Sequence, residues 1–392
     1  MNGFDADVAV VGLGSVGSMA AWRLAARGQS VHGYERFRVG HDRGAFSGQT
    51  RRFSVQSQRE PRWTALALAA QDLWRELEAA IRRPVLEQVG GVILGPGDAP
   101  AITGAWRSAE EAGLPYQVLR AAELAERFPQ HLVRPADTGV LDPLAGFVRP
   151  EAAVVGATRL AVDLGVTVFD RTRVLAVEAD GGGVSGGVTV RTAAGTRRYR
   201  TVVVAPGARA RDVLELARGT VLPRRLVQAW YLPHDVEAYR AEVFPVFERV
   251  GDVNAYGFPT VDGATIKIGV YTSAHPVVYD TDNVPLTVGD GLLTHLRDTV
   301  AAYFPGLHPE PVATTVNLEG YTTDGRPLVG PAPGAEGVLV ACGFSGAGFK
   351  FAPAVGDVLA DLVTTGNTKH DIGFLAPDRP LSTWPVETLT PA

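Results

Sequence analysis

Three glycines and one acid near the N-terminus have the spacing of a nucleotide-binding site. Gly12, Gly14 and Gly17 form the pattern G-x-G-x-x-G, and Glu35 ends the apolar run that follows. In this pattern the glycines let the backbone approach a pyrophosphate, a helix N-terminus offers N–H groups, and the acid accepts hydrogen bonds from ribose hydroxyls. The pattern predicts a dinucleotide without a 2′-phosphate, but by itself it does not distinguish NAD from FAD.

Lysine is rare in this chain, which makes each lysine a candidate catalytic residue. Among 37 basic residues the only lysines are Lys267, Lys350 and Lys369. Arginine keeps its charge almost everywhere, whereas a buried lysine readily loses its proton, so a retained lysine can serve a reaction. Lys267 lies in the alternating run 265–271, which predicts a strand, and a lysine pointing outward from that strand is the structural alternative.

The helices and strands that position these residues can be predicted from hydrophobic periodicity and from the proline and glycine residues at helix ends. Residues 7–11, 15–27 and 30–34 are expected to form a strand, a helix and a strand, the βαβ unit of a nucleotide site. Further helices are expected over 61–83, 102–112, 121–127, 152–164 and 353–364, the last one capped by Gly366. Strands are expected over 166–169, 197–204 and 337–341, and residues 222–272 indicate a mostly antiparallel sheet.

Composition narrows the class of protein. The chain has 392 residues, 46% of them hydrophobic, and a net charge of −5, so we expect two or three domains and no nucleic-acid or membrane partner. No apolar run approaches the ~18 residues of a membrane span. The single cysteine, Cys342, excludes a disulfide framework and suits the cytoplasm, and the eight histidines show no metal spacing, so no metal is expected.

Over nearly its whole length the sequence resembles the monomeric sarcosine oxidase and N-methyltryptophan oxidase family, within the D-amino-acid-oxidase and glycine-oxidase superfamily. The motifs are GLGSVG at 12–17, G-x-x-x-G-x-T-R at 44–51, YGFP at 256–259, IKIG at 266–269, CGFSGAGFKFAP at 342–353 and TGNTKHDIGFL at 365–375. The resemblance implies an α/β (α+β) fold with a Rossmann-like FAD-binding domain (1–85, 148–220 and 320–392) and a mostly antiparallel-sheet substrate domain (86–147 and 221–319). It also implies a monomer.

The resemblance implies FAD as the cofactor. In the family the glycine pattern binds the ADP half, the 44–51 loop covers the flavin, and the turn before the C-terminal helix meets the pyrimidine end of the ring. A helix N-terminus there would stabilise the negative charge of a reduced flavin. The FAD-binding residues expected on this basis are Gly12, Gly14, Ser15, Val16, Gly17, Glu35, Arg36, Ser47, Thr50, Arg51, Val174, Gly207, Gly343, Phe344, Gly346, Gly348, Phe349 and Lys350.

The resemblance also assigns catalytic roles. Lys267 matches the family lysine that holds a water near flavin N5 and promotes reaction with oxygen. Lys350 matches the lysine that contacts the substrate carboxylate, and Tyr256 matches a tyrosine that borders the substrate. The family's covalent flavin cysteine falls on Asn317, which cannot form a thioether, so we expect non-covalent FAD. Cys342 is interpreted as a small buried side chain in the glycine turn.

Several departures bear on the substrate. A tyrosine of the family's pocket becomes Glu319, which either binds a cationic nitrogen or turns to solvent. An arginine that binds the substrate carboxylate in the family is replaced here by Ser54. Arg52 could take its place, but as the next residue along the strand it is expected to point the other way from Arg51, away from the site. A family histidine near Lys267 falls on Tyr271, and one in the flavin-covering loop falls on Ser47. These changes favour a substrate other than sarcosine.

The predicted function is a flavin-dependent oxidase of a secondary, N-methyl or primary amine or amino acid. A hydride leaves the carbon next to nitrogen for flavin N5, the imine forms, and O2 becomes hydrogen peroxide. The main alternative is an oxidase or dehydrogenase of a cyclic imino acid, similar to pipecolate or proline, in a biosynthetic pathway. A flavin monooxygenase is disfavoured because the glycine turn lacks its G-D motif. A NAD-dependent dehydrogenase or a non-catalytic nucleotide-binding protein would lack the yellow colour of FAD.

Overall fold

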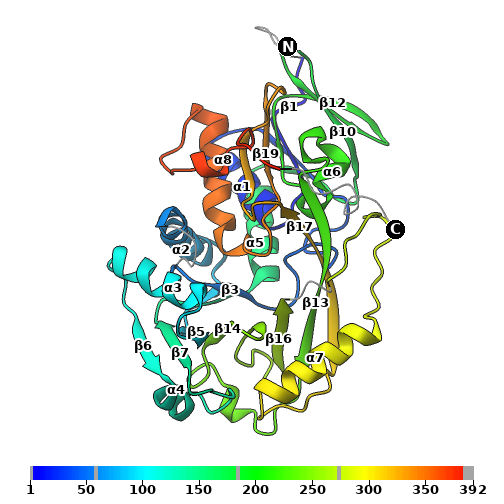
Figure 1. Ribbon diagram of the computed structural model, residues 1–392. Coiled ribbons are helices and arrows are strands. Elements are labelled where there is room, and N and C mark those ends of the chain that lie inside the picture. The colour runs from blue at the N-terminus through cyan, green and yellow to red at the C-terminus, as the bar shows by residue number, and fades with distance from the viewer. Residues whose placement is uncertain (1–2, 57–60, 182–185, 272–274, 383–392) are drawn as a thin grey trace.

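The computed structural model describes residues 3–56, 61–181, 186–271 and 275–382. The strands form two eight-stranded sheets and a small sheet of three strands (Figure 1). Within the described ranges, no helix combines the length and the apolar character needed to cross a membrane. The same residues contain no group of three or more metal-ligating side chains placed to hold an ion.

The first sheet has a parallel centre in the spatial order β9, β2, β1, β12, β19. These strands are β1 (Ala6–Val11), β2 (Val31–Tyr34), β9 (Thr167–Phe169), β12 (Gly195–Val204) and β19 (Val338–Cys342). The antiparallel strands β10 (Val174–Ala179), β11 (Val188–Thr192) and β18 (Leu328–Pro331) extend it. β19 is buried throughout, as expected for an apolar strand covered on both faces. Cys342 ends β19 rather than lying in the turn, and it is fully buried.

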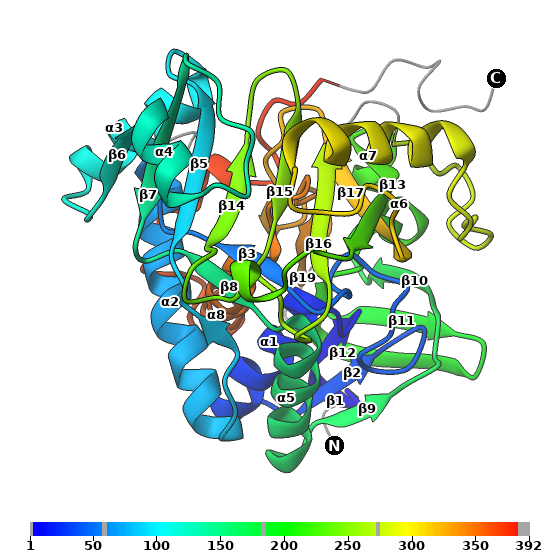
Figure 2. The ribbon, with the colours of Figure 1, turned by 90° about the horizontal axis from the view of Figure 1, so that it is seen from below.

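A layer of helices covers one face of this sheet. Helix α1 (Ser15–Ala26) contacts β1 and β2 and lies between α5 (Pro150–Asp163) and α8 (Ala352–Thr365), and α2 (Pro61–Ile81) packs against α5 and α8 (Figure 2). A Cβ at Gly356 would lie 2.6 Å from Cβ of Met19, so this glycine lets α8 approach α1 closely. Gly366 caps α8 in the left-handed conformation, which confirms the predicted C-cap.

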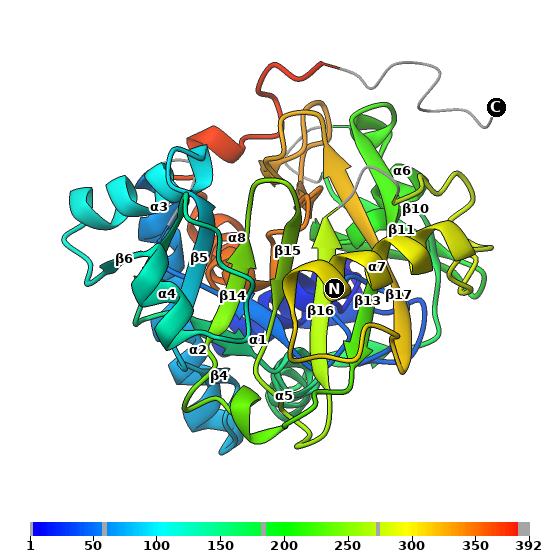
Figure 3. The same ribbon diagram turned by 60° about the horizontal axis from the view of Figure 1, so that its bottom comes forward.

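The second sheet has the order β17-β13-β16-β15-β14-β5-β7-β6. Its strands are β5 (Gly91–Pro96), β6 (Gln117–Arg120), β7 (Asp137–Asp142), β13 (Val221–Tyr231), β14 (Val246–Arg249), β15 (Asn254–Gly257), β16 (Ile266–Tyr271) and β17 (Ala313–Thr322). Only the β14–β5 pair is parallel, so the expected antiparallel sheet over 222–272 is confirmed. Helix α7 (Asp290–Tyr303), which the sequence analysis did not predict, lies across this sheet (Figure 3).

The remaining elements lie between the two large sheets or beside one of them. The small sheet consists of β3 (Arg51–Phe53), β8 (Gly146–Val148) and β4 (Leu86–Glu87), and it lies between the larger sheets in Figure 1. Helices α3 (Pro100–Glu111) and α4 (Ala121–Arg127) flank β5, β6 and β7, and the short α6 (Ala210–Val213) follows β12. β17 runs from the second sheet toward the first, where Tyr321 bridges to Phe344. β3 and β17 therefore bring residues from both halves to one place.

The division of strands between the sheets suggests a division into domains. Residues 1–85, 148–220 and 320–392 supply every strand of the first sheet, and 86–147 and 221–319 supply the second except for the end of β17. Each large sheet also has its own buried apolar cluster. We propose that these two sets of segments are the FAD-binding and substrate domains.

Candidate active site

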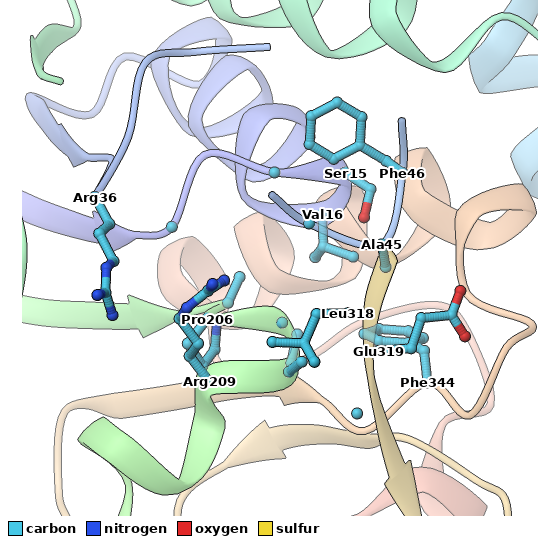
Figure 4. Close-up of a pocket in the computed structure, with 18 of the residues that line it drawn as sticks. Ser15, Val16, Arg36, Ala45, Phe46, Pro206, Arg209, Leu318, Glu319 and Phe344 are labelled. Carbon is cyan, nitrogen blue, oxygen red and sulfur yellow. The ribbon is translucent and has the colours of Figure 1, made fainter. Parts of the chain in front are cut away.

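A cavity opens at the carboxyl ends of the parallel strands of the first sheet (Figure 4). Val11 and Gly12 line it after β1, Glu35 after β2, Pro206 after β12 and Gly343 after β19. Ligands of open α/β sheets bind in this position, outside the carboxyl ends of the strands. The cavity contains about 1320 Å³ of empty space, its open mouth included. We call it the cofactor cavity.

The three N-terminal glycines have two structural roles: close packing of the backbone and an open N-terminus of α1. A Cβ at Gly12 would lie 2.4 Å from the carbonyl oxygen of Ala205, and a Cβ at Gly17 would lie 1.7 Å from that of Gly12. These two glycines therefore let β1, β12 and α1 pack closely, and Gly17 does not line the cavity. A Cβ at Gly14 would meet nothing closer than Phe46 at 3.9 Å, and Gly14 caps α1 without a side-chain hydrogen bond. The N-terminus of α1 thus faces the cavity as an anion-binding site.

The carboxylate of Glu35 is buried and already has partners. It accepts hydrogen bonds from the backbone N–H of Leu13 at 3.0 Å and of Phe37 at 2.9 Å, and Nε2 of His41 lies 3.3 Å away. Burial alone raises the pKa of Glu35, but these partners outweigh it and hold the pKa below its ordinary value. Glu35 therefore stays ionised at the cavity wall, where it can accept hydrogen bonds from ribose hydroxyls.

Arginines gather at the end of the cavity near Glu35. Arg36 and Arg173 both bind Asp282, at 2.6 and 2.8 Å. Arg209 donates to the carbonyl oxygen of Thr281, while its buried Nε has no hydrogen-bond partner within the described part of the chain. Burial, and then the charge of Arg36, lowers the pKa of Arg209 to about 10. Arg36 was expected here from the sequence and Arg209 was not, although Arg209 ends the turn at Gly207 that was expected to approach the cofactor.

The loop 44–51 is held against β17 by a polar network. Arg51 donates to the carbonyl oxygens of Ala45, Ser47 and Thr50. The amide of Asn317 donates to the carbonyl oxygen of Gly44 at 2.8 Å and to Oγ of Ser47 at 2.9 Å, and its oxygen accepts from Gln228. Gly44, Ala45, Phe46 and Arg51 line the cofactor cavity. Ser47 and Thr50, which were expected to bind FAD, do not line this cavity.

The glycine-rich turn after β19 closes the cavity on the other side. Gly343 and Gly346 have φ of 72° and 82°, a conformation that favours glycine. The N–H of Ser345 donates to the carbonyl oxygen of Gly320, so the turn is tied to β17. The lining residues contributed by this turn and its continuation are Gly343, Phe344, Ser345, Gly346, Gly348 and Phe349.

A second cavity adjoins the first, and we call it the substrate cavity. Arg51, Glu319, Phe344, Ser345, Gly346 and Phe349 line both cavities. The aromatic residues of its wall include Trp63, Tyr256, Phe258, Tyr271, Tyr321 and Phe351. Gly269 faces Tyr256 across the β15–β16 pair, where a Cβ would lie 2.3 Å from the tyrosine ring, so this glycine makes room for Tyr256.

Charged side chains of both signs lie in the wall of the substrate cavity. Lys350 lines it from the 3₁₀ turn before α8, with Nζ 3.3 Å from the carbonyl oxygen of Ser54. Arg52 also lines it and binds Glu248 at 2.5 Å. The expectation that Arg52 points away from the site is therefore wrong. β3 has only three residues and lies between the two larger sheets, so both of its faces border the site.

Lys267 is buried, but it does not line either cavity. Its Nζ donates to the carbonyl oxygens of Gly48 at 2.7 Å and Thr50 at 2.6 Å, and lies 4.4 Å from the ring centre of Phe258. Burial, and then the charge of Arg51, lowers the pKa of Lys267 well below its ordinary value. Lys267 is thus an inward-facing lysine behind the loop 44–51, not one that points out to solvent.

The predicted site residues divide into three groups by position. Those that line the cofactor cavity are Gly12, Gly14, Ser15, Val16, Glu35, Arg36, Arg51, Val174, Gly207, Gly343, Phe344, Gly346, Gly348 and Phe349. Tyr256, Tyr271 and Lys350 line only the substrate cavity, although Lys350 was also expected at the cofactor. Glu319 lines both cavities, as do Arg51, Phe344, Gly346 and Phe349 of the first group. Gly17, Ser47, Thr50 and Lys267 lie behind these walls. The residues missed by sequence reasoning include Phe37 and His41, which reach the cavity from a loop without a distinctive pattern, and Arg209, which ends the 3₁₀ turn that begins at Gly207.

The first cavity fits FAD on its own geometry. The uncapped N-terminus of α1 suits a pyrophosphate, and ionised Glu35 suits a ribose. The orphaned Nε of Arg209 offers a donor at the same end. The turn 343–348 and Arg51 would lie along the flavin, at the wall shared with the substrate cavity.

Comparison with known proteins also supports FAD as the cofactor. The sequence model of the family described as FAD dependent oxidoreductase matches residues 7–362. The monomeric sarcosine oxidase of Streptomyces avermitilis is 33% identical over 377 residues, which cover 95% of this chain and 97% of that protein. The N-methyl-L-tryptophan oxidase of Citrobacter koseri is 28% identical over 373 residues, covering 93% and 96%.

Solved structures show the same fold. NikD, described as an unusual amino acid oxidase essential for nikkomycin biosynthesis, is 25% identical with a TM-score of 0.82, covering 95% of this chain and 97% of that one. Glycine oxidase from Geobacillus kaustophilus is 21% identical with a TM-score of 0.80, covering 96% and 99%. The family resemblance, the fold class and the FAD cofactor expected from the sequence are confirmed. This chain belongs to the FAD dependent oxidoreductase family, as a flavoenzyme related to the monomeric sarcosine oxidases and N-methyl-L-tryptophan oxidases.

Proposed function

We propose that this enzyme oxidises the C–N bond of an amine or amino acid and uses O2 as the electron acceptor. The observation that carries the proposal is the substrate cavity, because it shares a wall with the cofactor cavity. A molecule bound there would meet the flavin directly, as transfer of a hydride requires. The names of the relatives support an amine or amino-acid substrate.

Lys350 is the proposed anchor for a substrate carboxylate. Its ammonium has three N–H donors, and Nζ lies in the wall of the substrate cavity, 4.9 Å from the ring centre of Phe351. A carboxylate held there would fix one end of the substrate, and the aromatic wall that includes Tyr256 would enclose its apolar part. The contribution of these residues is orientation and exclusion of water.

When bound, FAD accepts a hydride equivalent from the carbon next to nitrogen and passes two electrons to O2, which leaves as hydrogen peroxide. Lys267 is the proposed source of positive charge for the oxygen step. Its Nζ is fixed by two backbone carbonyls and cannot turn to solvent. In its protonated form, a lysine held in this way would stabilise negative charge that develops on oxygen.

We further propose that FAD is bound non-covalently. Asn317 has an amide instead of a thiol, and that amide is occupied by Gly44, Ser47 and Gln228. Cys342 is the only cysteine of the chain, is fully buried and does not line either cavity. Burial raises the pKa of Cys342 to about 12, so its thiol stays protonated and unreactive.

The test is a visible spectrum before and after acid precipitation, followed by a peroxide-coupled screen. The screen contains the protein amino acids in both enantiomers, sarcosine, N-methyl-L-tryptophan, L-pipecolate and simple amines. Yellow colour in the acid supernatant and peroxide from at least one compound are expected. Flavin in the pellet would contradict non-covalent binding. Absence of peroxide, and of flavin bleaching under anaerobic conditions, with every compound would contradict the amine substrate.

A cyclic imino acid is the second candidate for the substrate. The rings of Trp63, Tyr256, Phe258 and Phe351 in the cavity wall suit a compact apolar ring such as that of proline or pipecolate. In that case L-proline or L-pipecolate would exceed the open-chain amino acids in the screen. Replacing O2 with a dye acceptor would distinguish an oxidase from a dehydrogenase, because only a dehydrogenase needs the dye.

The protein is also proposed to be a monomer. The name of the relative from Streptomyces avermitilis supports this state. Size-exclusion chromatography with light scattering should give the 41.5 kDa of one chain. A mass of twice that value would contradict it.

A further inference from the structure

Glu319 has an unusual position, because its carboxylate lies at the wall common to the two cavities. It comes from β17, and Figure 4 shows its side chain leaving the strand on the side opposite to Leu318 and passing Phe344. A Cβ at Gly346 would lie 3.5 Å from Oε2 of Glu319, so the carboxylate abuts the glycine turn. A substrate positioned between the flavin and the aromatic wall would meet this carboxylate.

The carboxylate of Glu319 is only weakly engaged by the protein. Within the described part of the chain, it accepts a long hydrogen bond of 3.4 Å from the hydroxyl of Tyr321. Arg51 on β3 lies near enough to act on it electrostatically, but the guanidinium donates to loop carbonyls and to Gln228. Glu248, the other carboxylate in the wall of the substrate cavity, is paired with Arg52 at 2.5 Å.

The titratable and charged groups around Glu319 come from several elements. They are Arg51 on β3, Tyr256 on β15, Tyr271 on β16, Tyr321 on β17 itself, and Arg224, which stands opposite Glu319 on β13. Burial raises the pKa of Glu319, while Arg51 and the hydroxyl of Tyr321 oppose that rise. The net effect makes Glu319 a better proton acceptor than an ordinary carboxylate.

We infer that Glu319 accepts the proton of the substrate's ammonium group before hydride transfer. This inference rests on the proposed amine substrate. An N–H bond of the ammonium breaks, an O–H bond forms on Glu319, and the nitrogen keeps the electron pair. The neutral amine can then release hydride from the neighbouring carbon, and Glu319 later returns the proton to solvent. Charges balance, since an ammonium and a carboxylate become an amine and a carboxylic acid.

The inference limits the class of substrate. The substrate is a primary, secondary or tertiary amine that binds in its protonated form, because only such a nitrogen has a proton to give. A quaternary ammonium of the same shape has no proton to transfer and is not oxidised. A neutral amide gives no ion pair with Glu319 and binds poorly.

The experiment measures how fast the bound FAD of the holoenzyme is bleached under anaerobic conditions, from pH 5.5 to about 9, with the fastest compound of the peroxide screen. In the wild type the proton moves within the complex, so the limiting rate is flat through neutral pH and falls only where Glu319 becomes protonated. In Glu319→Gln the proton must leave to water first. The rate should then fall about tenfold for each pH unit below the pKa of the bound amine.

Matched variants separate this role from a general loss of charge. Glu248→Gln removes a carboxylate from the same cavity and should keep the flat profile, and Glu319→Asp should largely restore it. A second readout needs no turnover. The visible spectrum of oxidised holoenzyme without substrate should show an ionisation between pH 4 and 9 in the wild type and in Glu248→Gln, and none in Glu319→Gln. Glu319→Ala replaces the Gln variant in both measurements if the latter loses FAD.

The outcomes are distinguishable. A Glu319→Gln profile that coincides with the wild type would overturn the role of Glu319 and leave the amine oxidase standing. An unchanged spectral titration in that variant would overturn it as well. If no amine bleaches the wild-type flavin, the proposed function itself fails and this inference fails with it.

Discussion

The proposed carboxylate anchor makes a quantitative prediction. Lys350→Met keeps an unbranched side chain that can pack on Phe351, one heavy atom shorter, but removes the charge. A hydrogen bond to a charged group contributes about 1.5–3 kcal/mol. Because about 1.36 kcal/mol corresponds to a factor of ten, KM for an amino-acid substrate should rise about 10- to 150-fold. The contact is the same in the ground state and the transition state, so kcat should change little.

The assay is steady-state peroxide production with two matched substrates, an amino acid and the amine that lacks its carboxyl group. Only the amino acid should lose affinity in Lys350→Met. Lys369→Met is the control, since Lys369 is exposed and lies on neither cavity wall. An equal rise in KM for both substrates would refute the anchor, because the loss would then come from packing rather than from charge.

Three further predictions test other parts of the molecule. Lys267→Met should leave anaerobic flavin reduction intact but slow reoxidation by O2 about ten- to hundredfold, measured by stopped-flow absorbance; unchanged reoxidation would contradict its role. Asp137→Asn leaves Arg249 as a buried unpaired cation and should cost about 3–5 kcal/mol in denaturant unfolding, whereas exposed Asp252→Asn should cost under ~1 kcal/mol. Burial lowers the pKa of His131 to about 3, so the unfolded chain binds its proton first as the pH falls below 6.5. Stability should therefore drop by up to about 1.36 kcal/mol per pH unit between 6.5 and 3, and His131→Phe should flatten that slope.

The parts of the site that could be predicted are local in the sequence. The glycine pattern, the helix that follows it and Glu35 lie within one βαβ unit, so their spacing fixes their positions. The motif at 342–353 likewise runs without interruption from the end of β19 through one turn into the start of α8. Lys350 reaches the substrate cavity from the end of that turn, whose residues 344–346 and 349 line both cavities.

The parts that could not be predicted depend on long-range contacts. Arg209 lines the cofactor cavity with Thr281 and Asp282 of the substrate half beside it, contacts that its place in the sequence does not reveal. Helix α7 was missed because only four of its 14 residues are buried, so its apolar stripe is weak. The direction of Arg52 was wrong because alternation along β3 predicts which face a side chain takes but not that both faces border the site.

The charges in the substrate cavity favour a zwitterion over a simple amine. Arg52 and Glu248 lie 2.5 Å apart, so their opposite charges largely cancel for a ligand some distance away. Lys350 and Glu319 lie in the same wall and carry opposite charges. A zwitterion could place its carboxylate at Lys350 and its ammonium at Glu319, whereas a simple amine would use only Glu319 and a simple acid would be repelled by it. For this reason we expect amino acids to be the better substrates.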